Sequence, residues 1–247
     1  MALEIFWGSG SPFSWRVLLG AEIKGLEYES RLLEFSKGHM KAPEFLQMNP
    51  RGRVPVIRDD GFVLFESLPI LEYLEDKSPE IPLFGKDPRE VAFVRRLISE
   101  FESYLREPLF NLTLGLLRSA GAGPPGRAMT PDELEETAKA AQRELKTLEE
   151  RVAGGSWLVG GAPSAADVAL YPFVATLQRA TTKAETLARE IGLHPLGEVY
   201  PSIRRWMGLV EAVPGYERTY PPHWRADVVS TLAGRTRFSA STIRHLE

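Results

Sequence analysis

The sequence predicts an α/β domain followed by an all-helical domain. Strand and helix patterns alternate from the N-terminus to Lys77, and a strand–helix–strand crossover implies a sheet covered by a helix layer. Residues 78–85 contain too much Pro and Gly for a regular element, so we interpret them as the linker. Strand signals end there, and helical patterns follow. We expect domains at 1–78 and 88–219 and a C-terminal extension at 220–247.

The first domain is expected to run β-α-β-α-β-β-α. Its strands are short segments that favour extended backbone, and they are predicted at 3–7, 27–33, 53–57 and 62–65. Asp59-Asp60-Gly61 is the hairpin turn signal between the last two strands. The resulting order implies one sheet with helices packed on it.

The helices of this domain have recognisable ends. Pro12 at the first helical position makes Ser11 the natural N-cap, and Gly25 closes the helix. A short helix or loop fills residues 36–48. Ser67 is expected to cap the last helix of the domain, in which apolar residues fall at helical spacing.

The second domain is predicted to be a helical bundle. Capping boxes at Asp87–Glu90 and Ser164–Asp167 mark two helix starts, and Thr130 marks a third. The expected helices span about 88–118, 131–153, 165–180, 184–191 and 201–213. The third of them is apolar on several sides, so we expect it at the centre of the bundle. We assign Ser164 and Asp167 to structure, because the capping box accounts for both.

Composition narrows the class of protein. A net charge of -3 over 247 residues argues against a general surface for nucleic acid. No apolar run approaches the roughly 18 to 20 residues that a membrane helix needs, and the N-terminus lacks the basic region of a signal peptide. Cysteine is absent, which excludes disulfides and a protein thiol nucleophile. With only four His and no H-E-x-x-H motif, we expect no metal site and a cytoplasmic protein.

The stretch from Asn49 to Lys77 carries the strongest functional signal. Pro55 lies inside a strand signal, where a cis Val54–Pro55 bond would turn the Val54 backbone towards a ligand. Glu66 and Ser67 place a carboxylate and a hydroxyl at a helix N-terminus, which attracts an anion. A carboxylate beside an anion site suits a ligand that carries both an ammonium and a carboxylate group. The pattern therefore indicates an α-amino acid moiety.

Ser11 is the candidate for a second role at the same sheet edge. A hydroxyl at a helix N-terminus stabilises a bound thiolate, and since the chain has no thiol the ligand must supply it. Ser9 and Ser14 flank Ser11 closely, so the hydroxyl that faces the sulfur is open among the three. Ser11 and Ser67 could also be plain N-caps, and Glu66 a solvated carboxylate.

The chain resembles the cytosolic glutathione S-transferases over roughly its first 215 residues. Five motifs in order carry the resemblance: Ser11-Pro12-Phe13-Ser14-Trp15-Arg16-Val17, Asn49-Pro50-Arg51-Gly52-Arg53-Val54-Pro55-Val56, Glu66-Ser67-Leu68-Pro69-Ile70-Leu71-Glu72-Tyr73-Leu74, Gly161-Ala-Pro-Ser164-Ala-Ala166-Asp167, and Tyr200-Pro201 with Trp206 and Val213-Pro214. The resemblance implies a thioredoxin-like N-terminal domain, an all-helical C-terminal domain and a homodimer.

The resemblance also implies roles for individual residues. Ser11 would hydrogen-bond the glutathione sulfur, as in the serine-type members, and keep it as a thiolate. Val54 before a cis Pro55 would pair by its backbone with the cysteinyl moiety, while Glu66 and Ser67 would hold the γ-glutamyl end. The remaining implied contacts are Lys41 and Arg53 to the glutathione backbone or glycyl carboxylate, and Phe13, Tyr104, Pro108 and Asn111 to an apolar second substrate.

Sub-class markers are mixed. Phe6 and Trp7 stand where tyrosine-type members carry their tyrosine, and Ser11 stands where omega-like members carry cysteine. The Ser-Ser-Cys loop of the zeta, maleylacetoacetate isomerase branch is replaced by Ser11-Pro12-Phe13, which is closer to the tau-like pattern. Where phi-like members have a glutathione-contacting His, this chain has Met40.

We interpret the chain as a cytoplasmic, metal-free glutathione transferase of detoxification type, which binds glutathione and a small hydrophobic electrophile. Two alternatives stay open. One is an inactive transferase-like module that binds a partner through its C-terminal tail, where arginines outnumber acids; the blander interpretation of this tail is a loosely ordered surface extension. The other is a glutathione-dependent peroxidase, dehalogenase or etherase. The sequence does not separate these reactions from transfer, because no motif identifies the residues of the second-substrate pocket.

Overall fold

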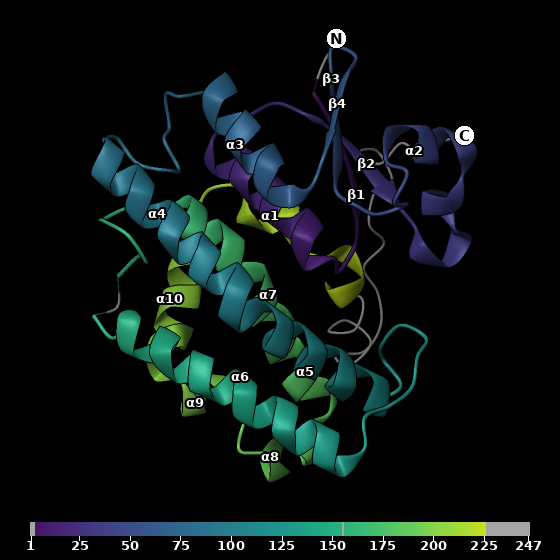
Figure 1. Ribbon diagram of the computed structural model, residues 1–247, viewed down its shortest axis with the longest axis vertical. Coiled ribbons are helices and arrows are strands. Elements are labelled where there is room, and N and C mark those ends of the chain that lie inside the picture. Colours follow the sequence, from purple (N-terminus) through teal and green to yellow (C-terminus); the bar gives the residue numbers. More distant parts are fainter. Residues whose placement is uncertain (1–2, 155, 226–247) are drawn as a thin grey trace. The chain divides into compact units, whose positions relative to one another are not determined.

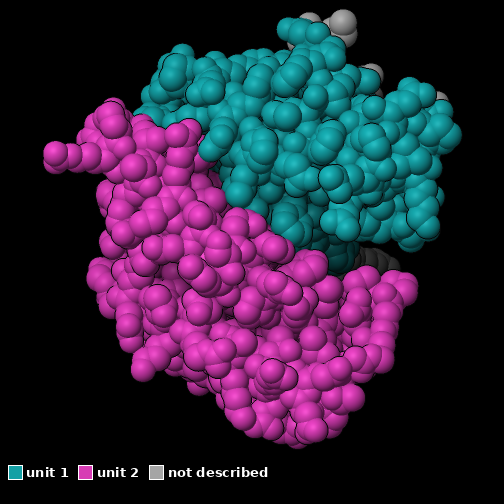
Figure 2. All heavy atoms as spheres, viewed as in Figure 1, with its two compact units in different colours: residues 1–83, 214–247 teal, residues 84–213 magenta. Residues whose placement is uncertain are grey.

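The chain forms two compact units. The computed structural model describes residues 3–154 and 156–225 (Figure 1). One unit consists of Met1–Leu83 together with Pro214–Glu247, and the other of Phe84–Val213; Figure 2 colours them separately. Residues 214–219, which we expected in the helical domain, thus group with the N-terminal unit. Most of the expected extension, from 226 on, lies outside the described residues.

A four-stranded sheet organises the first unit. Its strands are β1 (Glu4–Gly8), β2 (Glu29–Leu33), β3 (Val56–Asp59) and β4 (Phe62–Phe65), in the spatial order β2-β1-β3-β4. β1 runs parallel to β2 and antiparallel to β3, with Ile5 opposite both Ser30 and Ile57. Asp60 and Gly61 both have positive φ, as a two-residue hairpin turn of the favoured type requires. The predicted order of strands and helices is confirmed.

Helices cover both faces of this sheet. α1 (Pro12–Ile23) and α3 (Ser67–Lys77) pack against each other and share a core with alternate β1 residues, Ile5 and Trp7 among them. The intervening β1 residue Phe6 faces the opposite side, where it packs with Phe45 of α2 (Pro43–Met48). The period of two along a strand therefore sends one apolar set to each helix layer. The second strand begins at Glu29 and the third at Val56, later than expected.

The second unit is all-helical in its described residues, as predicted. Its helices are α4 (Pro88–Glu100), α5 (Arg106–Ser119), α6 (Pro131–Arg151), α7 (Ala165–Lys183), α8 (Glu185–Glu190), α9 (Leu196–Val199) and α10 (Pro201–Glu211). The expected helix 88–118 is interrupted by a π-helical stretch, Phe101–Leu105. α7 is buried along most of its length. No helix of the described residues is long and apolar enough to cross a membrane.

The three predicted helix starts of the second unit are capped by the expected residues, but one of the two predicted capping boxes is incomplete. Asp87 accepts from the backbone N–H groups of Arg89 and Glu90, so it caps α4. The Glu90 carboxylate, however, accepts from Lys86 N at 2.8 Å, whereas a capping box needs the Asp87 N–H. Thr130 and Glu133 form a complete box at the start of α6. The capping box at the start of α7 is also confirmed.

Asp167 does more than complete this box. Its buried carboxylate accepts from Ser164 N at 2.8 Å and Ser164 Oγ at 2.6 Å. It also accepts from Leu158 N at 3.0 Å and from Trp206 Nε1 at 2.8 Å. Burial raises the pKa of Asp167, and these four hydrogen bonds oppose the rise. One carboxylate thereby joins α7, α10 and the loop before α7, so the capping box alone does not account for this residue.

We predict that Asp167→Ala will lower the free energy of unfolding by roughly 3 kcal/mol or more. The substitution removes a helix cap and leaves buried hydrogen-bond donors without an acceptor. Thr130→Ala is the matched control: it removes an exposed cap, so its loss should be only about 1 kcal/mol. Urea unfolding followed by circular dichroism measures both. Equal losses in the two variants would show that Asp167 acts only as a cap.

Candidate functional site

The junction between β1 and α1 places Ser11 as expected. Ser11 is the N-cap of α1, and its Oγ accepts from Ser14 N at 3.3 Å. Its own N–H donates to Gly8 O at 3.1 Å, which closes the turn that leaves the strand. The cap bond uses an oxygen lone pair and leaves the hydroxyl hydrogen available to donate. A half-buried donor therefore lies at the positive end of a 12-residue helix.

The three neighbouring serines have different environments. Ser14 is fully buried, and its Oγ accepts from Gly8 N at 3.3 Å, so it supports the turn from inside. Ser9 Oγ lies 2.6 Å from Nδ1 of His223, a residue that the sequence analysis did not connect with this loop. Among the described residues, Ser11 Oγ is thus the one of the three hydroxyls that bonds only to the cap N–H. This difference favours Ser11 as the hydroxyl that meets a ligand.

The loop before β3 is held by Asn49, to which the sequence analysis gave no role of its own. Asn49 is 2% exposed; its Nδ2 donates to Arg53 O at 2.7 Å and its Oδ1 accepts from Arg51 N at 3.0 Å. The Val54–Pro55 bond is cis, as predicted. Because β3 begins at Val56, Pro55 lies just before the strand and costs no ladder hydrogen bond. Asn49 thereby fixes the backbone that leads into Val54.

The start of α3 differs from the expectation. Glu66, and not Ser67, is the residue at the N-cap position: its φ is 75°, and its C=O accepts from Ile70 N at 3.0 Å. Ser67 is the first helical residue and is only 5% exposed. A positive φ in a residue with a side chain costs on the order of 1–3 kcal/mol and is concentrated at functional sites. The exposed Glu66 carboxylate and the N–H groups of α3 therefore share one strained corner.

Arg16 links α1 to this corner and was missed by the sequence analysis. It is 1% exposed, its Nη1 donates to Ser67 Oγ at 3.2 Å, and its guanidinium lies 5.5 Å from the ring centroid of Phe13. The signal was available, since an arginine interrupts an otherwise small and apolar run of α1. A buried positive charge next to the N-terminus of α3 increases the attraction for an anion there. Arg16 thereby joins two segments of the predicted site.

The cationic candidates lie on the surface of the first unit. Lys41 is exposed and ends a 3₁₀ turn, His39–Lys41, while Arg53 is exposed in the loop that Asn49 holds. Within residues 3–154 and 156–225, neither charged group takes part in a hydrogen bond or an ion pair. Within the described residues, no group of three or more His, Asp or Glu side chains could hold a metal ion.

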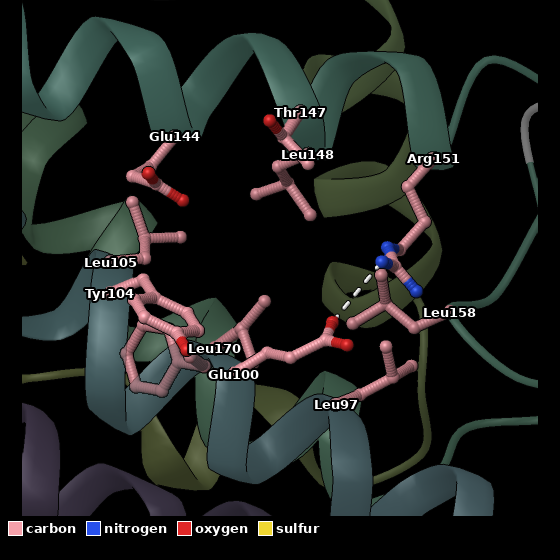
Figure 3. Close-up of a pocket in the computed structure, with 11 residues that line it drawn as sticks. Leu97, Glu100, Tyr104, Leu105, Glu144, Thr147, Leu148, Arg151, Leu158 and Leu170 are labelled. Carbon is pink, nitrogen blue, oxygen red and sulfur yellow. Dashed lines mark hydrogen bonds and ion pairs between the residues drawn. The ribbon is translucent and has the colours of Figure 1, made fainter.

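Of the expected apolar lining, Tyr104 lines a pocket of the second unit. This pocket has a volume of about 360 Å³ and lies between α4, the π-helical stretch and α6 (Figure 3). Tyr104 is 64% exposed, and at the far side Arg151 Nη2 donates to Glu100 Oε2 at 3.2 Å. Pro108 and Asn111, which lie beyond the π-helical stretch in α5, do not line it. Phe13 belongs to the first unit, beside Arg16.

Comparisons with known proteins agree on one family. Residues 10–77 match the family model of the glutathione S-transferase N-terminal domain, and residues 131–208 that of the C-terminal domain. The chain is 31% identical to glutathione S-transferase A of Pleuronectes platessa over 90% of this chain and 92% of that protein. It is 34% identical to maleylacetoacetate isomerase of Rattus norvegicus, over 68% of this chain and 75% of that protein.

A solved structure supports the same fold. The crystal structure of a glutathione S-transferase from the Antarctic clam Laternula elliptica superposes with a TM-score of 0.71 at 30% identity, covering 91% of this chain and 94% of that one. The four-stranded sheet with its helices and the helical second unit match this architecture, so the predicted fold class is confirmed.

We predict that Asn49→Ala will lower the free energy of unfolding by about 1–3 kcal/mol, because the loop amide and carbonyl lose a buried partner. Asn111→Ala is the control, since an exposed helical amide should change stability by no more than about 0.5 kcal/mol. Urea unfolding monitored by tryptophan fluorescence compares the two. A neutral Asn49 variant would mean that the cis-proline loop holds its shape without this clamp.

Proposed function

The chain belongs to the glutathione S-transferase family, and we propose that it binds glutathione, keeps the glutathione sulfur as a thiolate and adds it to a hydrophobic electrophile. The observation that carries this proposal is the Ser11 hydroxyl at the N-terminus of α1, whose hydrogen is not donated to any of the described residues. Activation by Ser11 makes the enzyme serine-type. The products are a thioether and the leaving group or, for addition to a double bond, the protonated adduct.

The energetic scale of this activation follows from one hydrogen bond. A free thiol has a pKa near 8.5, so little of it is ionised at neutral pH. A hydrogen bond to a charged group contributes about 1.5–3 kcal/mol, and each pKa unit is about 1.36 kcal/mol. Ser11 with the helix dipole can therefore lower the thiol pKa by roughly one to two units. At neutral pH that raises the thiolate fraction by about ten-fold or more.

The rest of the site supports binding of the tripeptide by its ends. The backbone of Val54 is proposed to pair with the cysteinyl moiety. Glu66 accepts from the α-ammonium group, and Ser67 with the N–H groups of α3 donates to the α-carboxylate. The Arg16 charge behind Ser67 strengthens this carboxylate site. The glycyl carboxylate meets Lys41 or Arg53.

The second substrate is proposed to contact Phe13, Tyr104, Pro108 and Asn111. The active form is proposed to be a cytoplasmic homodimer, as the family resemblance implies.

Similarity to rat maleylacetoacetate isomerase supports a second candidate reaction, in which the same thiolate adds to and leaves a conjugated double bond. The Ser11-Pro12-Phe13 loop, which departs from the pattern of that branch, favours transfer over isomerisation. The two reactions are distinguished by comparing the rate of glutathione conjugation to an aryl halide with the rate of isomerisation of a maleyl ketone.

We expect Ser11→Ala to lower kcat/KM about 10- to 100-fold at neutral pH and to raise the pKa of bound glutathione by one to two units, because the thiolate loses its donor. Ser11→Asp is the matched variant: its carboxylate still caps α1, so it should fold normally, but it cannot donate to a thiolate and its charge opposes thiol ionisation, so it should be at least as impaired as Ser11→Ala. Ultraviolet absorbance of the thiolate, titrated against pH, measures the pKa. Turnover that survived in both variants would move activation to another group, Ser9 first.

We expect Glu66→Ala to weaken glutathione binding about ten-fold through loss of a charge-assisted contact to the ammonium group. Binding of a glutathione analogue that lacks this amine should not change, and Glu80→Ala, which removes an exposed linker carboxylate, is the control. Isothermal titration calorimetry gives both affinities. Equal affinity of the wild type and the Glu66 variant for glutathione would reduce Glu66 to a surface carboxylate.

A further inference from the structure

The C-terminal segment, defined as residues 214–225, packs on the first helix of the chain. It contains α11 (Tyr216–Thr219), which lies beside α1 (Figure 1). Trp15 Nε1 donates to Thr219 Oγ1 at 2.8 Å, and the rings of Trp15 and Trp224 meet edge to face with centroids 5.4 Å apart. Both tryptophans and Thr219 are buried. The segment is therefore an integral part of the first unit.

An ion pair fixes the register of the segment along α1. Arg218 Nε donates to both carboxylate oxygens of Glu22 at 3.0 Å, and Tyr28 Oη donates to the same carboxylate at 2.8 Å. The Glu22 side chain is only 3% exposed, so it relies on these partners to offset its burial. With Arg218 bound at one end and Trp224 at the other, the residues between them have little freedom to slide.

His223 is thereby held against the loop that precedes Ser11. Its Nδ1 is 2.6 Å from Ser9 Oγ, and its ring covers Gly10, where a Cβ atom would lie only 2.8 Å from His223 Cε1. Gly10 has a φ of +81°, a conformation that favours glycine independently of the available space. Two consecutive loop residues, Ser9 and Gly10, are thus fitted to one imidazole from a segment more than 200 positions away.

We propose that His223 is a positioning residue for thiol activation, an inference that rests on the proposed function. The loop Gly8-Ser9-Gly10-Ser11 contains two glycines and would be loose by itself. Electrostatic stabilisation of a thiolate requires a donor that is already oriented before the ligand binds. By bonding Ser9 and covering Gly10, His223 holds the turn whose last residue is Ser11. It acts through the loop and does not touch the sulfur.

The Ser9–His223 hydrogen bond is exposed, so a positioning role of His223 can be distinguished by experiment from a role in stabilising the fold. An exposed hydrogen bond contributes little to the free energy of unfolding, so its loss should leave the fold intact. Its effect on the orientation of Ser11 should appear instead in the thiol pKa and in kcat. The affinity for the thiol form of glutathione, measured at a pH below the pKa of the bound thiol, should not change, because Glu66 and Ser67 hold the far end of the ligand.

The test uses four variants of the full chain. His223→Phe keeps a ring over Gly10 and loses the bond to Ser9, while His223→Asn retains an acceptor close to the position of Nδ1. Ser9→Ala and the double variant Ser9→Ala/His223→Phe complete a cycle. Glu217→Gln, which removes an exposed ion pair with Arg225 in the same segment, is the control. Thiolate absorbance against pH, kcat and the glutathione Kd are measured for each, together with the thermal midpoint.

We expect His223→Phe to lower kcat and the thiolate fraction at neutral pH about three- to ten-fold, the range of a modest misorientation of one donor. Its thermal midpoint should remain near wild type, and so should its glutathione Kd measured at a pH below the pKa of the bound thiol. His223→Asn should recover most of the loss, and the double variant should be no worse than Ser9→Ala, since the two residues act as one unit.

An unchanged thiolate fraction in His223→Phe would overturn the inference, as would additive losses in the double variant or no recovery in His223→Asn. These outcomes leave the proposed function standing if the wild type ionises bound glutathione. A wild type that binds glutathione without ionising it would refute the proposed activation, and the role of His223 would fall with it.

Discussion

The first backbone N–H groups of α1 have no carbonyl partner inside the helix, and the way the chain satisfies them determines the rest of the site. The hydroxyl oxygen of Ser11 accepts a hydrogen bond from one of them, the Ser14 N–H, and this bond fixes the hydroxyl at the helix terminus. β1, a central strand of the sheet, leads directly into this turn, so the donor is anchored to the most buried part of the unit. The helix terminus thereby combines a structural need with a chemical use.

The elements with a strong local signal were predictable. The strand at 62–65 was placed correctly, because the two-residue turn before it requires positive φ and Asp-Gly supplies it. The cap of α3 was not, because a serine is the usual cap and a glutamate with positive φ leaves no mark in the sequence. The π-helical stretch in 101–105 was also hidden, since the apolar periodicity continues through it.

The candidate site shows the same division. Ser11, Val54–Pro55 and Glu66 belong to short motifs that can be read within a few residues of each other. Arg16 and Asn49 are recognised only once burial shows that a polar side chain has to be satisfied inside the protein. His223 is beyond the reach of local patterns, because its partner Ser9 lies 214 positions earlier in the chain. Sequence motifs thus identify the groups that meet a ligand better than the groups that orient them.

The first unit is built from both ends of the chain, and this has a consequence for biosynthesis. Residues 1–83 are synthesised before residues 214–225, yet Trp15 and Glu22 find their partners Thr219 and Arg218 only in that later segment. Until then the nascent polypeptide carries an uncovered indole and an unneutralised carboxylate on α1. The contacts that complete the first unit therefore form only after the intervening helical bundle has been synthesised.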